Sequence, residues 1–144
     1  CIRDSPKDAF ALGDEVLLLD DHCKLQSGAP LEVYQRPVGF VAADLMSDPG
    51  VNAFVTPATL VAAARHAAVR PEHVHLDATA LGNECSTFDM QVQGQETSGD
   101  ETFIHGMVDG NRWVIRRPGM VSVTPGQHLA VSVRTDDILR FGVA

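Results

Sequence analysis

The segment Leu25-Gln26-Ser27-Gly28-Ala29-Pro30-Leu31-Glu32-Val33-Tyr34-Gln35-Arg36-Pro37 contains several structural signals in close succession. Gly28-Ala29-Pro30 marks a turn. Pro30 suits the first position of a helix that runs through Gln35, because its fixed φ angle fits the helix and its missing N–H has no partner there. Pro37 ends this helix, since the residue before a proline is pushed out of the α region. The segment therefore predicts a turn followed by one short helix.

Short elements are expected on both sides of this segment. Upstream, Val16–Leu19 is a continuous apolar run, as in a strand that is buried on both faces, and Lys24–Ser27 would return as its hairpin partner. A helix fragment is expected over Lys7–Gly13 and a second short helix over Phe40–Met46. Together these elements predict a small α/β unit, which Asp48-Pro49-Gly50 would link to the rest of the chain.

The second half of the chain shows the period of two that is typical of half-buried strands. Asp109-Gly110 is a strong hairpin turn between Phe103–Val108 and Arg112–Arg116, because glycine tolerates the positive φ of a tight turn. Another turn is expected at Thr124-Pro125-Gly126. Alternating apolar residues are Phe88, Met90 and Val92 in one run, and Leu129, Val131 and Val133 in another. The pattern predicts a small antiparallel β-domain.

One segment between these halves has a helical pattern. Thr56-Pro57 offers an N-cap followed by a proline in the first turn. An apolar stripe follows at helical spacing, formed by Leu60, Val61, Ala64 and Ala68. The sequence therefore predicts a helix here, before the strands begin at Val69.

The motifs and their order resemble the junction between the nucleotide-binding domain and the C-terminal accessory domain in the ATPase subunits of carbohydrate-importing ABC transporters. That family has a hairpin ending in Gln-x-Gly-x-Pro, a helix reading Glu-x-Tyr-x-x-Pro, then Phe-Val-Ala and Pro-x-x-Asn. This chain carries Gln26–Pro30, Glu32–Pro37, Phe40–Ala42 and Pro49–Asn52 in the same order. Further similar segments are Asp8–Asp14, Val69–Val74, Glu96–Thr102 and Phe141-Gly142.

The resemblance implies a mainly β fold with an α/β remnant. Residues 1–48 would be the C-terminal remnant of the nucleotide-binding domain, and residues 49–144 a TOBE domain, a variant of the OB barrel. Between Asn52 and Ala67 the family places further strands, where this chain has an alanine-rich segment. The sequence therefore leaves open whether the barrel is complete or abbreviated.

The resemblance also implies a function. The chain would be the regulatory and dimerisation portion of an ATP-binding subunit that drives the import of sugars or polyols, with ATP and magnesium bound by the full-length subunit. The implied partners are a second ATPase subunit, transmembrane permease subunits and a regulatory protein. The subunit would be cytoplasmic and peripheral on the inner face of the cell membrane through its permease.

The chain itself lacks the motifs for ATP hydrolysis. No Gly-x-x-x-x-Gly-Lys-Ser/Thr loop occurs to cradle phosphates, and no apolar strand ends in Asp-Glu to hold magnesium and the attacking water. The family's signature motif is also absent, and its switch histidine corresponds to Asp4. We therefore expect a fragment that is inactive alone, with no catalytic, cofactor or metal residue.

The candidate regulatory or interface residues are polar groups at turns and apolar groups on the second half of the Asp109-Gly110 hairpin. They are Arg70, Glu72, Glu96, Gly99, Trp113 and Ile115. For the polar residues the competing interpretation is turn chemistry and a solvated ion pair worth about 0–1 kcal/mol. For Trp113 and Ile115, which with Met107 would form an apolar patch rimmed by Arg116 and Arg117, the alternative is the barrel core.

The composition of the chain disfavours several other classes of function. The net charge of −8 disfavours nucleic acid, which needs a basic face, and 6% aromatic residues offer few stacking platforms. Cys1, Cys23 and Cys85 form no disulfide pattern and fit a reducing cytosol. His73-Val74-His75 has metal-like spacing without a third ligand, so an exposed strand is favoured. A sensor of oxyanions or small molecules, using Ser98-Gly99, Thr102 and Arg70, is the alternative function.

Overall fold

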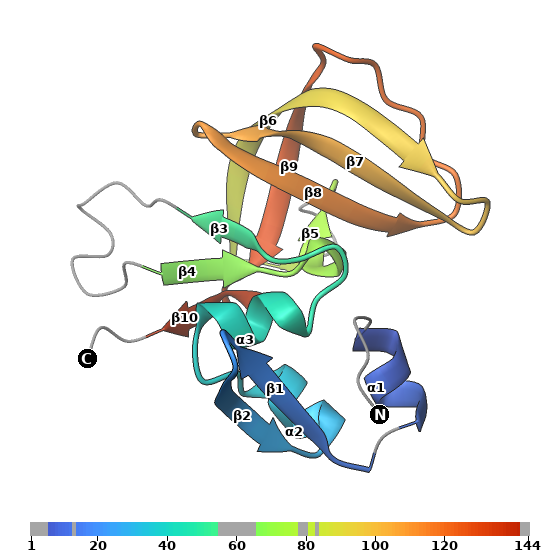
Figure 1. Ribbon diagram of the computed structural model, residues 1–144. Coiled ribbons are helices and arrows are strands. Elements are labelled where there is room, and N and C mark those ends of the chain that lie inside the picture. The colour runs from blue at the N-terminus through green and yellow to red at the C-terminus, as the bar shows by residue number, and fades with distance from the viewer. Residues whose placement is uncertain (1–5, 13, 55–65, 78–80, 83, 142–144) are drawn as a thin grey trace. The chain divides into compact units, whose positions relative to one another are not determined.

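The computed structural model describes residues 6–12, 14–54, 66–77, 81–82 and 84–141 (Figure 1). The chain divides into two compact units, Cys1–Val51 and Asn52–Ala144. The linker expected at Asp48-Pro49-Gly50 lies just before this division, and the Asp48–Pro49 peptide bond is cis.

The first unit contains three helices and one β-hairpin among its described residues. The two strands pair antiparallel around a turn in which Asp21 and His22 have φ angles of 46° and 63°. The elements are α1 (Pro6–Leu12), β1 (Val16–Asp20), β2 (Cys23–Gly28), α2 (Pro30–Gln35) and α3 (Phe40–Leu45). The hairpin and the short helices predicted from the proline and turn signals are therefore confirmed.

The core of the first unit is small. Val33 of α2 is fully buried and lies close to Gly28, where an added Cβ would meet its Cγ2 at 3.4 Å. Tyr34 is only half-buried and packs edge-on against Phe10, with ring centroids 5.6 Å apart. Of these two neighbouring residues of α2, Val33 and Tyr34, only Val33 is therefore fully buried.

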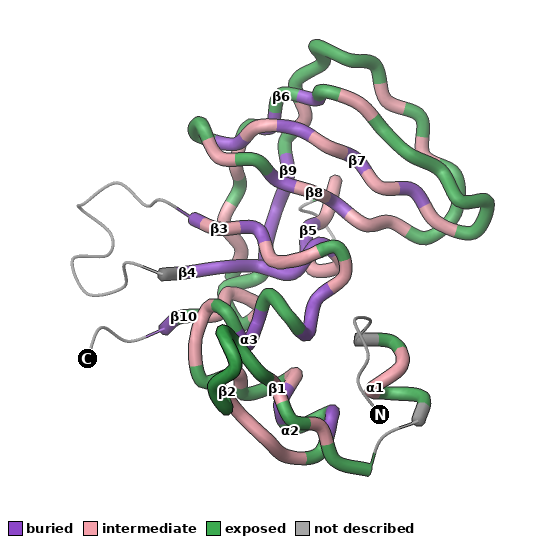
Figure 2. The backbone as a smooth tube through the Cα atoms, in the orientation of Figure 1, coloured by how far each residue is buried: buried purple, intermediate pink, exposed green. Residues whose placement is uncertain are grey.

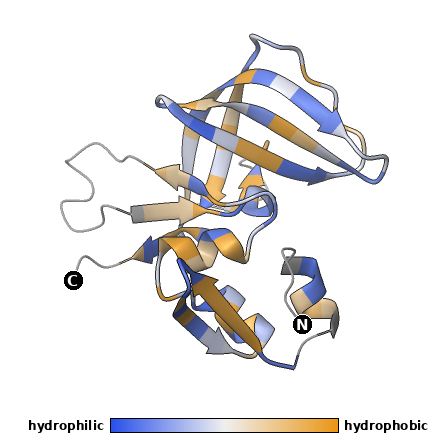
Figure 3. Cartoon of the chain, in the orientation of Figure 1, coloured by the Kyte–Doolittle hydropathy of each residue, from blue (hydrophilic) through white to orange (hydrophobic). Residues whose placement is uncertain are grey.

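Strand β1 is apolar along most of its length, but it is not buried on both faces as predicted (Figures 2 and 3). Leu17 and Leu19, which share one face of the strand, are 56% and 52% exposed. The prediction was wrong because an apolar run shows only that a strand tends to be buried. Actual burial needs a second layer of structure, which the described residues do not place over this face.

The second unit is built almost entirely of strands. One sheet of three strands has the order β10-β4-β3, and a second sheet of five strands has the order β5-β9-β6-β7-β8, with antiparallel neighbours throughout. The strands are β3 (Asn52–Phe54), β4 (His66–Val69), β5 (Val74–His75), β6 (Cys85–Thr97), β7 (Glu101–Val108), β8 (Asn111–Pro118), β9 (His128–Arg134) and β10 (Leu139–Phe141). The 3₁₀ turns are η1 (Pro71–His73) and η3 (Thr135–Asp137).

The five-stranded sheet curls around one apolar core, as in an OB-like barrel (Figure 1). Along β7 every second residue is buried, and β6 shows the predicted alternation at Met90 and Val92 (Figure 2). Asp109 and Gly110 form the predicted hairpin turn, with φ angles of 48° and 81°. The largest fully buried side chains of the unit include Trp113, Met90, Ile104 and Ile115. The mainly β fold with an α/β unit is confirmed.

The segment expected to replace strands of the barrel in fact supplies two. Strand β4 lies between β3 and β10, and Ala68 pairs with both Ala53 and Leu139. Ala68 was assigned to a helical stripe because of its spacing from the apolar residues before it, but pairing with strands distant in sequence overrides that local pattern. The other members of the stripe, Leu60, Val61 and Ala64, lie outside the described residues.

Candidate functional site

Strand β8 is the last strand of the five-stranded sheet, and the side chain of Asn52 covers part of its open edge. Asn52 Nδ2 donates to Val114 O at 2.8 Å, and its Oδ1 accepts from Val114 N at 2.7 Å. One amide side chain thus makes the two bonds that a neighbouring strand would make. Trp113 Nε1 adds a bond of 3.1 Å to Ala53 O, so β3 is held against β8 without ladder pairing.

A second set of side chains bridges β8 to β5, the strand at the other end of the sheet order. Arg117 Nη1 lies 3.5 Å from both Val74 O and His75 Nδ1. Partial burial, followed in importance by the Arg117 guanidinium, lowers the pKa of His75 below its ordinary value of 6.5. His73 and Arg134 act in the same direction, and Asp137 opposes them. This contact between β5 and β8 is therefore sensitive to the protonation of His75.

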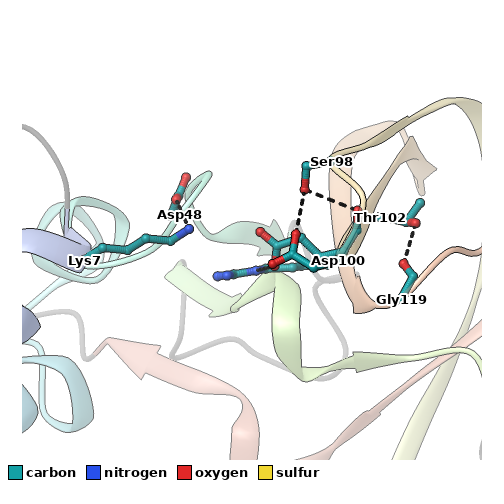
Figure 4. Close-up of polar contacts among 8 residues, drawn as sticks. Lys7, Asp48, Ser98, Asp100, Thr102 and Gly119 are labelled. Carbon is teal, nitrogen blue, oxygen red and sulfur yellow. Dashed lines mark hydrogen bonds and ion pairs between the residues drawn. The ribbon is translucent and has the colours of Figure 1, made fainter.

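The third feature is a pair of turns bonded to one another at one end of the barrel (Figure 4). Gly119 N donates to Asp100 O at 2.7 Å. The hydroxyl of Thr102, which is fully buried, donates to Gly119 O at 2.8 Å and accepts from Val121 N at 3.1 Å. Ser98 Oγ donates to Asp100 Oδ1 at 3.3 Å within the first turn. The chain on both sides of residue 120 is thereby fixed.

Pairs of polar side chains cross the outer face of the same strands. Arg116 Nε donates to Glu101 Oε2 at 2.7 Å, and its guanidinium lies 5.9 Å from the ring centroid of Phe103. His105 Nε2 lies 3.6 Å from Glu96 Oε2, which is too long for a hydrogen bond. Glu101 and Glu96, which flank the Gly99 turn, therefore contact neighbouring strands of their own unit.

The strand arrangement agrees with a comparison against known families. The family described as the TOBE domain matches residues 67–141, which run from within β4 to the end of β10. The chain belongs to the TOBE domain family.

Three curated relatives of this TOBE protein are named as import ATP-binding proteins. Two are sn-glycerol-3-phosphate import ATP-binding proteins UgpC. The one from Chromobacterium violaceum is 29% identical over 93% of this chain and 41% of its own length. The one from Cereibacter sphaeroides is 30% identical over 87% of this chain and 39% of its own length. The third is the xylose/arabinose import ATP-binding protein XacK of Haloferax volcanii, which is 28% identical over 93% of this chain and 41% of its own length. The chain spans about two fifths of the length of these relatives.

The TOBE barrel buries two of the predicted interface residues. Trp113 is 1% exposed and packs against Phe54, with ring centroids 4.9 Å apart, while Ile115 is fully buried in the same core. The expected apolar patch of Met107, Trp113 and Ile115 is therefore wrong, and the alternative, a filled barrel, is correct. The prediction failed because positions on one strand alternate between the two faces of the sheet, and residues 113 and 115 point inward.

The polar candidates of the TOBE domain lie in two places rather than one. Arg70 and Glu72 flank the buried Pro71 at the start of η1, and Arg70 is itself only 3% exposed. Glu96 and Gly99 belong to the β6–β7 hairpin, where Gly99 has a φ of +94°. The role of these residues between domains or subunits stays a prediction.

Other expected sites have less support in the described part of the TOBE protein. Residues 6–12, 14–54, 66–77, 81–82 and 84–141 contain no group of three or more His, Cys, Asp or Glu side chains that could hold a metal ion. A recess lined by Phe54, Val108 and Trp113 encloses about 10 Å³, which is at most the space for one water. No described helix is both long and apolar enough to cross a membrane.

Sequence reasoning missed the residues that hold the TOBE barrel together. Asn52 was noted only as the last residue of a Pro-x-x-Asn motif, and Arg117 only as the rim of a patch. Thr102 was considered as a ligand donor, although its hydroxyl is occupied within the fold. The exposed Met120 was not singled out. A lone large apolar residue in a loop rich in glycine and proline was the available signal for it.

Proposed function

We propose that this chain is the regulatory portion of the ATP-binding subunit of an ABC importer for sugars or polyols. The TOBE domain match and the names of the relatives support this proposal. In this proposal residues 1–48 complete a nucleotide-binding domain, and residues 49–144 form the accessory domain. The relatives import a phosphorylated polyol and pentose sugars by name, and a substrate of the same class follows for this chain.

The observation that carries the proposal is the apolar surface of the first unit. Large apolar side chains that are 40% exposed or more in this unit are Phe10, Leu17, Leu19, Leu31, Val38, Val41 and Leu45. Val41 and Leu45 lie on one side of α3, whereas Ala42 and Ala43 are buried on the other side, so this helix is apolar nearly all round. A helix with that pattern is normally buried. We assign its cover, and that of β1, to the rest of a nucleotide-binding domain.

The division of labour within the subunit follows from the motifs. ATP and magnesium bind to the part of the subunit that holds the phosphate loop, because no such loop occurs in this sequence. The accessory domain contributes contacts with partner subunits and takes no part in ATP hydrolysis. Its partners in this proposal are a second ATP-binding subunit and, through the nucleotide-binding domain, transmembrane permease subunits. These permease subunits place the complex on the cytoplasmic face of the membrane.

The alternative, an oxyanion sensor, finds less support in the contacts of its candidate donors. The Thr102 hydroxyl is bonded to Gly119 and Val121, and Ser98 Oγ is bonded to the Asp100 carboxylate, whose charge would repel an anion. Arg70, the only cation among the candidates, is 3% exposed. These groups do not offer a set of open donors, so we favour the importer subunit.

Reconstitution tests the importer proposal. The full subunit should be purified with its permease and assayed in proteoliposomes with its solute-binding protein. We expect ATP hydrolysis to rise several-fold when that protein is loaded with a sugar or with glycerol 3-phosphate. A full subunit that neither associates with a permease nor hydrolyses ATP in its presence would contradict the proposal.

A further inference from the structure

The strands at the two ends of the five-stranded sheet, β5 and β8, are not neighbours in its strand order. Strand β5 nevertheless lies beside β8 (Figure 1), and the 3₁₀ turn η1, which runs directly into β5, also lies against β8. Strand β5 has only two residues, and Val74 and His75 pair with Val133 and Ser132 of β9. We call the junction of η1 and β5 with β8 the seam of the barrel.

Arg117 of β8 reaches across the seam. Its Nη1 atom lies 3.5 Å from Val74 O and 3.5 Å from His75 Nδ1. A guanidinium has only donors, so His75 Nδ1 takes part in this contact as an acceptor, which requires a neutral ring with its proton on Nε2. A protonated ring has donors at both nitrogens. Protonation of His75 therefore removes the acceptor and brings two cations together across the seam.

The charged groups around His75 come from several elements, and most of them oppose a second positive charge. Burial of the ring lowers the pKa of His75 most, and Arg117 follows. His73 of η1 and Arg134 at the end of β9 lower the pKa further, whereas Asp137 of η3 raises it. A proton consequently binds His75 more tightly once the ring has left these surroundings, so acid favours separation of the seam.

We propose that Arg117 and His75 form a proton-sensitive closure of the barrel, in which protonation of His75 separates η1 and β5 from β8. The closure lies within the second unit and does not depend on the importer function. Val74, which is fully buried in the apolar core, becomes exposed in the open form, and this cost keeps the seam closed while His75 is neutral. The opening is local, because β6, β7 and β8 pair along ladders of their own.

Hydrogen exchange measured by NMR on the 144-residue chain tests this closure at the amides of η1. His73 N donates to Arg70 O, and Val74 N donates to Pro71 O, so both amides exchange faster when η1 loosens. Their protection factors are corrected for the intrinsic effect of pH on exchange. These factors should fall several-fold, and at most about tenfold, from about pH 7.5 to about pH 5.5, because one proton is taken up. The Ile104 amide of β7 should show no such fall.

Three variants separate the closure from other effects of acid. His75→Gln should abolish the fall, because glutamine offers Arg117 an uncharged acceptor at every pH. Arg117→Gln should raise the pKa of His75 in an NMR titration, because it removes the facing cation. His128→Gln is the matched control, since His128 is an exposed histidine whose Nδ1 lies 2.8 Å from Asp89 Oδ2, and the fall should persist in it.

Three results would overturn the closure. The first is a protection factor that stays constant with pH at both His73 and Val74. The second is a fall of the same size in His75→Gln, which would assign the effect to another group such as His73. The third is a parallel fall at Ile104, which would show that acid opens the whole sheet and not the seam.

Discussion

The packing around Gly106 of β7 leaves no room for a side chain. A Cβ added there would lie 2.5 Å from Gln91 O and 2.5 Å from Met90 Cε. The carbonyl belongs to the backbone of the neighbouring strand and cannot rotate away. Gly94 of β6 is a contrasting case, because a Cβ added there meets nothing within 4 Å. The same residue type is thus required at one position and optional at the other.

Gly106→Ala should lower the free energy of unfolding by at least about 1–3 kcal/mol, the usual cost of overpacking a core. Gly94→Ala should change the free energy of unfolding by less than about 1 kcal/mol. The substitution can even stabilise the protein, because alanine lowers the conformational entropy of the unfolded chain. Urea unfolding followed by the fluorescence of Trp113, the single tryptophan, measures both. An equal decrease in the free energy of unfolding in the two variants would contradict this prediction and show that strand β7 relaxes around the new methyl group.

Stability should fall as the pH falls through the range in which His75 titrates. Because burial and Arg117 lower its folded-state pKa, the unfolded chain takes up this proton first as the pH decreases. The contribution of neutral His75 is therefore fully present above pH 6.5 and is lost as the pH passes through the lower, folded-state pKa. His75→Gln should flatten this part of the profile of urea midpoint against pH. Identical profiles for the two proteins would contradict the environment described for His75.

Between elements, the side chain of Asn52 takes the place of a strand. It satisfies both backbone groups of Val114 on the open edge of β8, in a part-buried setting. Unpaired edges recruit other chains, so this contact also protects the sheet. Asn111 begins the same strand but makes no side-chain hydrogen bond among the described residues, which makes it a suitable reference.

Asn52→Ala should lower the free energy of unfolding by about 2–4 kcal/mol, because each backbone group of Val114 left without a partner costs about 1–3 kcal/mol. Asn111→Ala should cost less than about 0.5 kcal/mol, as is usual for a surface change. Hydrogen exchange should be accelerated at the Val114 amide in the first variant alone. An unchanged exchange rate there would show that water or another group replaces the Asn52 amide.

Local signals predicted the elements that depend on neighbours in sequence. The proline that opens α2 and the Asp109-Gly110 pair that turns between β7 and β8 act within a few residues, and both predictions are confirmed. Strand β4 was missed because its identity depends on pairing with β3 and β10, which lie outside any local window. The orientation of Trp113 was missed for a related reason, since a strand pattern does not say which face meets the core.

At the scale of the molecule, the two units differ in how much they bury. The described apolar side chains that are buried in the first unit are Pro30, Val33, Ala42, Ala43 and Met46, two of which are alanine. The second unit encloses a cluster that includes Trp113, Met90 and Ile104. The motif order indicated this organisation, but the contacts of Asn52, Thr102 and Arg117 join residues distant in sequence, so no spacing rule could predict them.

The amides of β1, β2 and α2 should exchange with solvent faster than those of β6, β7 and β9 in the 144-residue chain. A unit with less apolar burial opens at a lower free energy, and its amides exchange through those openings. Hydrogen exchange measured by NMR resolves the two sets. Equal protection in both units would contradict the view that the first unit lacks part of its core.

The central claim is that this chain supplies contacts within an importer ATPase while nucleotide binds elsewhere in the subunit. Isothermal titration with Mg-ATP, performed in parallel on the 144-residue chain and on the full subunit, tests it most directly. We predict no measurable binding to the chain and micromolar binding to the full subunit, because the phosphate loop is absent from this sequence. Micromolar binding to the chain alone, or no binding to the full subunit, would contradict the account.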